Sequence, residues 1–215
     1  MKAPQILFIT GTDTGVGKTV FAALATVYLR QQGFHVAALK PLCSGGRDDA
    51  RQLRAAAGKG LSLDEVNPWY FRAPLAPVLA ARKEGKRVRL REVAAHIQRV
   101  AKRFEVVVVE GAGGLLSPLG EDFDSRDLIL ALRATPIVVC PNQLGAVNQV
   151  RLVLDALPRP LACRARIVLV NPKKPDAASR TNLALLQEFV APDSLRVMPW
   201  LRVPRLAGRN ASGKM

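Results

Sequence analysis

The chain has 215 residues, of which 49% are hydrophobic and 23% charged, a balance typical of a globular domain. Its 32 Lys and Arg outnumber 17 Asp and Glu and give a net charge of +15. Such a charge points to nucleic acid, an acidic membrane surface or an anionic ligand. An aromatic content of 5% argues against stacking on single-stranded nucleic acid.

Cysteine, histidine and apolar patterning narrow these classes further. Three widely spaced cysteines suggest no disulfide framework and a reducing, cytoplasmic location, and two distant histidines argue against a His-based metal site. No apolar run approaches the roughly 18 residues that span a bilayer. The N-terminus lacks the pattern of a signal peptide, so we expect no membrane segment.

Strands and helices are expected to alternate along the chain. The segments 5–10, 36–40, 106–109, 135–140 and 167–170 are rich in β-branched and other apolar residues and predict strands. Helical spacing of apolar residues predicts helices at 18–32, 48–57, 76–84, 90–103, 125–133, 146–157 and 179–190. This order predicts an α/β fold with a central, mainly parallel β-sheet flanked by helices on both faces. We expect a single domain over 1–215, with 202–215 as a basic, loose tail.

The loop after the first strand has the composition of a phosphate-binding loop. Residues 11–19 read GTDTGVGKT, with five residues between Gly11 and Gly17 where the usual pattern has four. Glycines let backbone N–H groups surround phosphate oxygens, and the following helix presents its positive end. Lys18 is expected to reach the terminal phosphates and Thr19 to bind Mg²⁺. The fold is therefore expected to be of the P-loop NTPase type.

Charged residues end the other strands, and the carboxyl ends of parallel strands meet at one edge of a sheet. Glu110 closes the valine strand, where a carboxylate can hold Mg²⁺ or its waters, although it could also cap a turn. Asp49 can supply a second carboxylate, with Asp48 as a competing choice, and both also suit the start of a helix. Lys40 can stabilise a transferring phosphoryl group, although lysines at strand ends are often simply solvated.

Together these loops resemble dethiobiotin synthetase, the penultimate enzyme of biotin synthesis, over nearly the whole chain. The five-residue spacing in 11–19 is that family's form of the phosphate loop, and Lys40-Pro41 with Ser44-Gly45 resembles its catalytic-lysine motif. The remaining matches are 67–77 on the substrate side, VEGAGG at 109–114 in the Mg²⁺ and substrate loop, LGAVN at 144–148 on the dimer face, and Asn171 with PWL at 199–201 in the adenine pocket.

The resemblance implies a reaction and a set of residue roles. 7,8-Diaminopelargonic acid captures CO₂ as a carbamate, the carbamate attacks the γ-phosphate of ATP, and the second amine closes the ureido ring and releases phosphate. The implied catalytic residues are Lys40, Lys18, Thr12 and Ser44, and the implied Mg²⁺ ligands are Thr19, Asp49 and Glu110. The implied ATP-binding residues are Gly15, Val16, Gly17, Lys18, Thr19, Asn171, Pro199, Trp200 and Leu201. The implied substrate-binding residues are Ser44, Gly113, Gly114 and, from the partner in a homodimer with shared active sites, Leu144, Gly145 and Asn148.

Two other functions are compatible with a phosphate loop in an α/β fold. A Mg²⁺-ATP switch of the chromosome- and plasmid-partitioning type would bind DNA or a membrane with its positive charge. Such switches usually carry an early lysine in the phosphate loop, where this chain has Thr12-Asp13-Thr14. A synthetase half of a cobyrinic-acid amidase would need a glutaminase domain, for which we expect no room.

Ten basic residues lie in 72–103, away from the loops, so we expect a solvated surface rather than a nucleic-acid or membrane site. Preference between ATP and another nucleotide such as CTP stays open.

Overall fold

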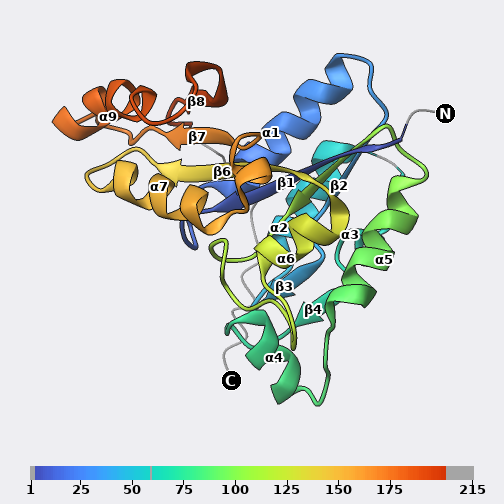
Figure 1. Cartoon of the computed structure of the whole chain (residues 1–215). Coiled ribbons are helices and arrows are strands. Elements are labelled where there is room, and N and C mark those ends of the chain that lie inside the picture. The colour runs from blue at the N-terminus through green and yellow to red at the C-terminus, as the bar shows by residue number, and fades with distance from the viewer. Residues whose placement is uncertain (1–2, 59, 202–215) are drawn as a thin grey trace, which may run out of the picture.

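A six-stranded β-sheet forms the centre of the molecule, which is seen in a computed structural model that describes residues 3–58 and 60–201. Its strand order is β2-β5-β1-β6-β7-β8, and each neighbouring pair is parallel (Figure 1). The strands are β1 (Gln5–Gly11), β2 (Val36–Leu39), β5 (Val106–Glu110), β6 (Thr135–Pro141), β7 (Arg166–Val170) and β8 (Leu195–Met198). The predicted α/β class with its parallel sheet is confirmed, and β8 extends the sheet by one strand that the sequence did not predict.

Helices cover both faces of the sheet, as predicted. One face carries α1 (Lys18–Gln31) and α2 (Asp48–Ala57), and the other carries α5 (Leu90–Ala101), α6 (Ser125–Leu132), α7 (Ala146–Ala156) and α9 (Ala177–Gln187). The shorter helices are α3 (Leu63–Val66), α4 (Pro77–Lys83), α8 (Arg159–Ala162) and the 3₁₀ turn Pro192–Ser194. None of the helices in the described part of the chain is long and apolar enough to cross a bilayer.

The strand of four valines shows how the sequence produces this sandwich. Every residue of β5 is buried. Val107 and Val109 pack in the core beneath α5 and α6, whereas Val106 and Val108 pack in the core beneath α1 and α2. Because alternate side chains of a strand point to opposite faces, a strand that is apolar at every position must be covered on both sides.

A second, two-stranded parallel sheet lies beside the main one. It consists of β3 (Leu42–Ser44) and β4 (Trp69–Phe71), and Figure 1 shows it together with α4 at one end of the molecule. The sequence predicted neither strand, because each has only three residues and is punctuated by prolines nearby. The expected basic tail 202–215 lies outside the described residues, and the single domain over 1–215 stays a prediction.

The arrangement of β1 determines where a ligand can sit. β1 lies between β5 and β6, and the chain leaves it toward β2 on one side and later adds β6, β7 and β8 on the other. The loops at the carboxyl ends of strands diverge at such a reversal and leave a crevice for ligands. The loops after β1, β2 and β5 meet at this point, and they contain most of the predicted site residues.

Candidate nucleotide and substrate site

The loop after β1 has the backbone geometry of an anion-binding turn. Gly15 and Gly17 have φ values of 75° and 99°, in the left-handed region that glycine adopts without steric cost. At Gly11 a Cβ atom would lie 2.7 Å from Val16 Cγ2, so this tight turn requires glycine. Since α1 begins at Lys18 directly after the loop, its free N–H groups face the concave side, where a phosphate can be held.

The Lys18 side chain folds back over this loop. Its Nζ donates a hydrogen bond of 2.6 Å to the Asp13 carbonyl oxygen, and only 6% of the residue is exposed. Burial and the neighbouring Lys40 ammonium lower the pKa of Lys18 to about 8. Two ammonium groups that face one cavity repel each other, so an anionic ligand between them relieves that repulsion.

Glu110 connects the loops after β1, β2 and β5. Its Oε1 accepts hydrogen bonds from Lys40 Nζ at 2.5 Å and from Thr19 Oγ1 at 2.9 Å. Lys40 Nζ also donates to the Gly111 carbonyl oxygen at 2.9 Å. Burial disfavours the charge of Lys40, but the carboxylates of Glu110 and Asp49 outweigh it, and the pKa of Lys40 is raised. Lys40 therefore stays a cation in a buried position.

The two candidate aspartates at the start of α2 point to different places. Asp49 Oδ2 lies 3.4 Å from Lys40 Nζ, and Asp49 lines the cavity at this site. Asp48 is exposed and pairs with Arg51 of its own helix at 2.6 Å. The structure thus brings Asp49 rather than Asp48 to Lys40 and Glu110.

The donors gathered here fit a Mg²⁺ ion. Glu110 Oε2 is buried, and no hydrogen-bond partner for it is found within residues 3–58 and 60–201. Together with the Thr19 hydroxyl and Asp49, it offers the hard oxygen ligands that Mg²⁺ prefers. No three His, Cys, Asp or Glu side chains cluster as a metal site in the described chain, so Asp49, Glu110 and Thr19 would supply only part of the ligands of such an ion.

These groups line a cavity of about 960 Å³. The predicted site residues in its lining are Gly15, Gly17, Lys18, Thr19, Lys40, Ser44, Asp49, Glu110 and Gly113. Three predicted residues lie beside the cavity without lining it: Thr12, Val16 and Gly114. Val16 is buried in the core. A Cβ on Gly114 would lie 3.2 Å from the Thr12 carbonyl oxygen, so the Glu110 loop and the phosphate loop pass in close contact.

The sequence did not single out several lining residues. Gln52 and Ser117 add polar groups to the wall. The segment 74–77, which the sequence had placed within the substrate-side segment 67–77, closes one side. Gln52 could have been found, because it lies one helical turn after Asp49, whereas the position of Ser117 depends on the path of its loop. Cys43 also lines the cavity, but burial raises the pKa of its thiol to about 11, so it is not a thiolate nucleophile near neutral pH.

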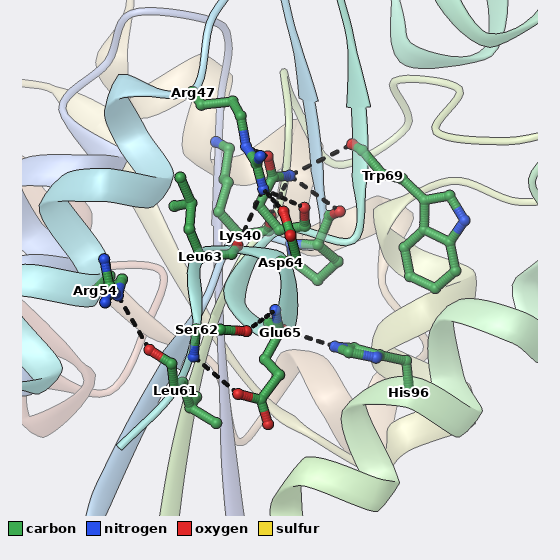
Figure 2. Close-up of polar contacts among 12 residues, drawn as sticks. Lys40, Arg47, Arg54, Leu61, Ser62, Leu63, Asp64, Glu65, Trp69 and His96 are labelled. Atoms are coloured by element: carbon green, nitrogen blue, oxygen red, sulfur yellow. Dashed lines mark hydrogen bonds and ion pairs between the residues drawn. The ribbon is translucent and has the colours of Figure 1, made fainter. Parts of the chain in front are cut away.

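Asn67 supports the Lys40 loop from beneath rather than facing the cavity. Its Nδ2 donates to the carbonyl oxygens of Lys40 at 2.9 Å and Pro41 at 3.2 Å, and 1% of the residue is exposed. Arg47 Nε donates to Asn67 Oδ1 at 3.0 Å, and its Nη2 bonds Asp64 at 2.8 Å. Figure 2 shows the Arg47 side chain pointing toward Asp64 and Leu63, close to Lys40. The sequence placed Asn67 in a substrate-side segment, but in the structure its amide binds backbone.

The expected adenine-pocket residues lie at the ends of β7 and β8. A Cβ on Gly17 would lie 3.5 Å from Val170 and 4.0 Å from Met198, so the phosphate loop ends next to these two strands. Asn171 follows β7, and its backbone N–H donates to the Met198 carbonyl oxygen at 2.9 Å. The next residues after Met198 are Pro199, Trp200 and Leu201, all exposed. Neither Asn171 nor these three residues belong to the lining of the cavity of about 960 Å³.

The expected dimer-face residues do not meet the first cavity within one chain. Leu144, Gly145 and Asn148 line a second cavity of about 1200 Å³, between α7, α8 and α9. Leu144 is 86% exposed, and Leu152 and Phe189 in the same wall are also exposed. An apolar surface of this kind is typical of a contact with another chain.

Comparison with known proteins agrees with this geometry. The fold and the phosphate loop define a P-loop nucleotide-binding protein, and a family model described as an AAA domain matches residues 5–205. A ParA family ATPase from Chlorobium tepidum TLS shares the fold with a TM-score of 0.57 over 92% of this chain and 85% of that chain, at 13% identity.

Curated relatives identify the family. The ATP-dependent dethiobiotin synthetase of Anaeromyxobacter dehalogenans (strain 2CP-C) is 40% identical over 90% of this chain and 89% of its own length. That of Bacillus subtilis (strain 168) is 34% identical over 90% and 87%. The chain belongs to the ATP-dependent dethiobiotin synthetase family.

Proposed function

We propose that the cavity of about 960 Å³ is where the γ-phosphate of ATP meets the carbamate of 7,8-diaminopelargonic acid. As a member of its family, the protein is an ATP-dependent ligase of biotin biosynthesis that forms dethiobiotin. The observation that carries the assignment is the convergence of Lys18, Lys40 and Glu110 from three different loops on one cavity.

The residues around this cavity divide the chemistry among them. The N–H groups of the loop with Gly15, Gly17 and Thr19 hold the phosphates at the start of α1. Lys18 and Lys40 neutralise the negative charge that the carbamate and the γ-phosphate bring together. Such a phosphoryl transfer needs positioning and charge neutralisation more than a dedicated protein base, and the raised pKa of Lys40 keeps that residue cationic for the task.

The substrate amines are positioned by hydroxyl groups and by glycine backbone. Ser44 lines the cavity after β3, and Thr12 Oγ1 is buried without a partner in the described chain. These two hydroxyls are suited to hydrogen bonds with the carbamate or with the free amine. Gly113 and Gly114 lack side chains where the substrate passes the backbone. After phosphorylation, the second amine attacks the carbonyl carbon of the mixed anhydride, the bond from that carbon to the phosphate oxygen breaks, and phosphate leaves as the ureido ring closes.

Thr19, Asp49 and Glu110 would hold Mg²⁺. The ion supplies charge that orients and neutralises the terminal phosphates of ATP when it is bound. The buried Glu110 Oε2 with no partner in the described chain supports this assignment, as does the placement of Asp49 near Lys40. The carboxylate oxygens of Glu110 and Asp49 would bind the ion directly or through a water molecule.

A homodimer would complete the site. The substrate's distal carboxylate needs a positive partner, and α7 begins at Ala146 after Gly145, with Leu144 exposed beside it. A carboxylate at a helix N-terminus is stabilised by the free N–H groups there. The apolar second cavity supports a contact between two copies through this face.

The three free cysteines support a cytoplasmic location.

Release of ADP tests the assigned reaction. Purified protein with Mg²⁺-ATP should release ADP when both 7,8-diaminopelargonic acid and bicarbonate are present, and neither compound alone should give the full rate. Double-stranded DNA or anionic vesicles should not stimulate the reaction. Stimulation by DNA without any response to the diamine would favour a partitioning-type switch, and analytical ultracentrifugation of the same sample tests the dimer.

A further inference from the structure

Three asparagine side chains, of which Asn142 and Asn182 are buried and Asn171 is half-buried, form a chain of hydrogen bonds where the family resemblance implies the adenine contact. Asn142 follows β6, Asn171 follows β7, and Asn182 lies on α9. Asn142 Nδ2 donates to Asn171 Oδ1 at 2.7 Å, and Asn182 Nδ2 donates to Asn142 Oδ1 at 2.9 Å. Asn142 is 2% exposed and Asn182 is 6% exposed, so water does not compete for these bonds.

Backbone carbonyl groups fix the direction of this chain. Asn142 Nδ2 also donates to the Ser179 carbonyl oxygen at 2.8 Å, and Asn182 Nδ2 donates to the Gln143 carbonyl oxygen at 2.9 Å. A carbonyl can only accept a hydrogen bond. Rotation of the Asn142 amide by 180° would therefore place oxygen against oxygen at Ser179 and nitrogen against nitrogen at Asn182. The orientation of Asn142 has a single satisfied solution.

The orientation of Asn142 determines which end of Asn171 is held. Asn142 offers only a donor to Asn171, so Asn171 must present Oδ1 to it and turn Nδ2 away. Within the described residues, no hydrogen bond of Asn171 Nδ2 is found. Asn171 thus presents to a ligand one free donor beside an oxygen that retains a second lone pair.

This donor and acceptor pair matches one kind of purine edge. Adenine carries an acceptor at N7 beside a donor at the 6-amino group, whereas a 6-oxopurine carries acceptors at both positions. An asparagine amide can satisfy both adenine atoms at once only in one orientation. In the opposite orientation both contacts with adenine would join like groups.

We propose that Asn142 and Asn182 are positioning residues that lock the Asn171 amide and thereby select a 6-aminopurine nucleotide over a 6-oxopurine nucleotide. The inference rests on the proposed function, in which ATP is the substrate, and on the adenine contact that the family resemblance implies for Asn171. Base preference is then controlled by Asn142 and Asn182 as well as by the contact residue Asn171. Neither residue has to touch the nucleotide.

The test compares ATP with inosine triphosphate, which differs from ATP only in its 6-oxo group and adjoining ring proton. We expect the wild-type protein to have a kcat/KM for ATP that is at least about fivefold higher, the lower bound for one bidentate base contact. Asn142→Asp keeps the shape of the side chain but offers Asn171 an acceptor, so Asn171 turns over to donate Nδ2. The ratio of kcat/KM for ATP to kcat/KM for inosine triphosphate should then fall to about one or below. The fall should come mainly from a higher KM for ATP, and kcat should change less.

Four further variants separate the possible outcomes. Asn142→Ala and Asn182→Ala release the lock without reversing it, so each should lower the ratio less than Asn142→Asp does. Thr181→Ala is the matched control, because Thr181 is exposed next to Asn182 and bonds only its own helix, and its ratio should equal that of the wild type. Asn171→Ala removes the contact residue itself and should abolish the preference.

Thermal unfolding of each variant establishes that the readout comes from folded protein. If folded Asn142 variants keep the wild-type ratio while Asn171→Ala loses it, the lock is wrong and the base pocket stands. If Asn171→Ala also keeps the ratio, or the wild type has no preference, the base is not at Asn171 and both ideas fail. Should the Asn142 variants not fold, an unchanged ratio in Asn182→Ala overturns the lock by itself.

Discussion

The phosphate side and the base side of this sheet edge are built from different chemistry. On the phosphate side, Lys18, Lys40 and Glu110 are charged and nearly buried. On the base side, Asn142 and Asn171 are neutral amides joined by a directed hydrogen bond of 2.7 Å. Both sides lie at the carboxyl ends of neighbouring strands of one sheet.

The difference teaches how one edge of a sheet can bind both halves of a nucleotide. Coulomb attraction is strong in a buried site and depends little on the orientation of the groups. A hydrogen bond between amides is weaker, but it depends steeply on which atom donates. The phosphate side should therefore respond to the removal of charge and to pH, and the base side to the reversal of an amide.

Loss of the Lys40 ammonium should have the largest effect on the charged side. We predict that Lys40→Ala lowers kcat by about 100-fold or more, because it removes preorganised charge stabilisation from the transition state. ADP release at saturating diamine, bicarbonate and ATP measures this. Lys83→Ala is the control, since Lys83 is exposed on α4 and does not line the cavity. An unchanged kcat in Lys40→Ala would remove Lys40 from the catalytic site.

Loss of the Glu110 charge should weaken Mg²⁺ binding and should change kcat at saturating Mg²⁺ much less. We predict that Glu110→Gln raises the Mg²⁺ concentration needed for half-maximal activity by about tenfold or more, the usual cost of altering a ligand or its supporting partner. A Mg²⁺ titration of ADP release measures the shift, with the exposed Glu188→Gln as the matched control. An unaltered titration would mean that Glu110 serves only to hold Lys40 and Thr19.

Much of the fold could be predicted because periodicity and strand composition are local signals. The valines of β5 could be assigned to a doubly covered strand without knowing their neighbours. The strands β3, β4 and β8 could not, because each has four residues or fewer and exists through pairing with a distant segment. Leu42 pairs with Trp69 across 27 positions of sequence, and neither segment has the length or alternation of a strand.

The site was predictable to the extent that its groups follow strands. Lys40 directly follows β2 and Glu110 ends β5, and the parallel pairing of the two strands alone brings them together. Asp49 could not be separated from Asp48 by sequence, because both suit a helix start and only the direction of each side chain decides. The roles of Asn67 and Asn142 were missed for another reason: their partners are backbone carbonyls, which carry no sequence signal.

The lowered pKa of Lys18 predicts how ATP binding changes with pH. Below about pH 8, Lys18 is already protonated in the free protein, so Lys18 takes up no proton when ATP binds. Above that pH the free protein holds a neutral amine, and phosphate binding must take up a proton, so affinity should fall by up to about tenfold per pH unit. Calorimetric titration with ATP between pH 7.5 and 9.5 measures this.

A lysine-to-arginine replacement makes the control for this pH effect. Lys18→Arg stays charged throughout the range, so its affinity for ATP, although altered in size, should lose most of the pH dependence. A profile that falls equally in both proteins would place the titrating group elsewhere. Either result sharpens the comparison, because the amides of the base side do not titrate in this range.

The smallest expected effect tests whether the charged side depends on an amide of its own. Asn67→Ala removes this donor from the buried Lys40 carbonyl, whereas the Pro41 carbonyl keeps its bond from the Trp69 N–H. The loss should lower the free energy of unfolding by about 1–3 kcal/mol. Asp64→Ala removes only an ion pair with Arg47 whose carboxylate is 85% exposed, at a cost of at most about 1 kcal/mol. Urea unfolding of the two variants measures the difference.

Equal costs would mean that the Asn67 amide adds nothing to the stability of the Lys40 loop. A larger cost for Asn67→Ala would mean that both sides of the sheet edge rely on oriented amides, and that they differ only in what those amides hold: a charged loop on one side and a neutral contact residue on the other.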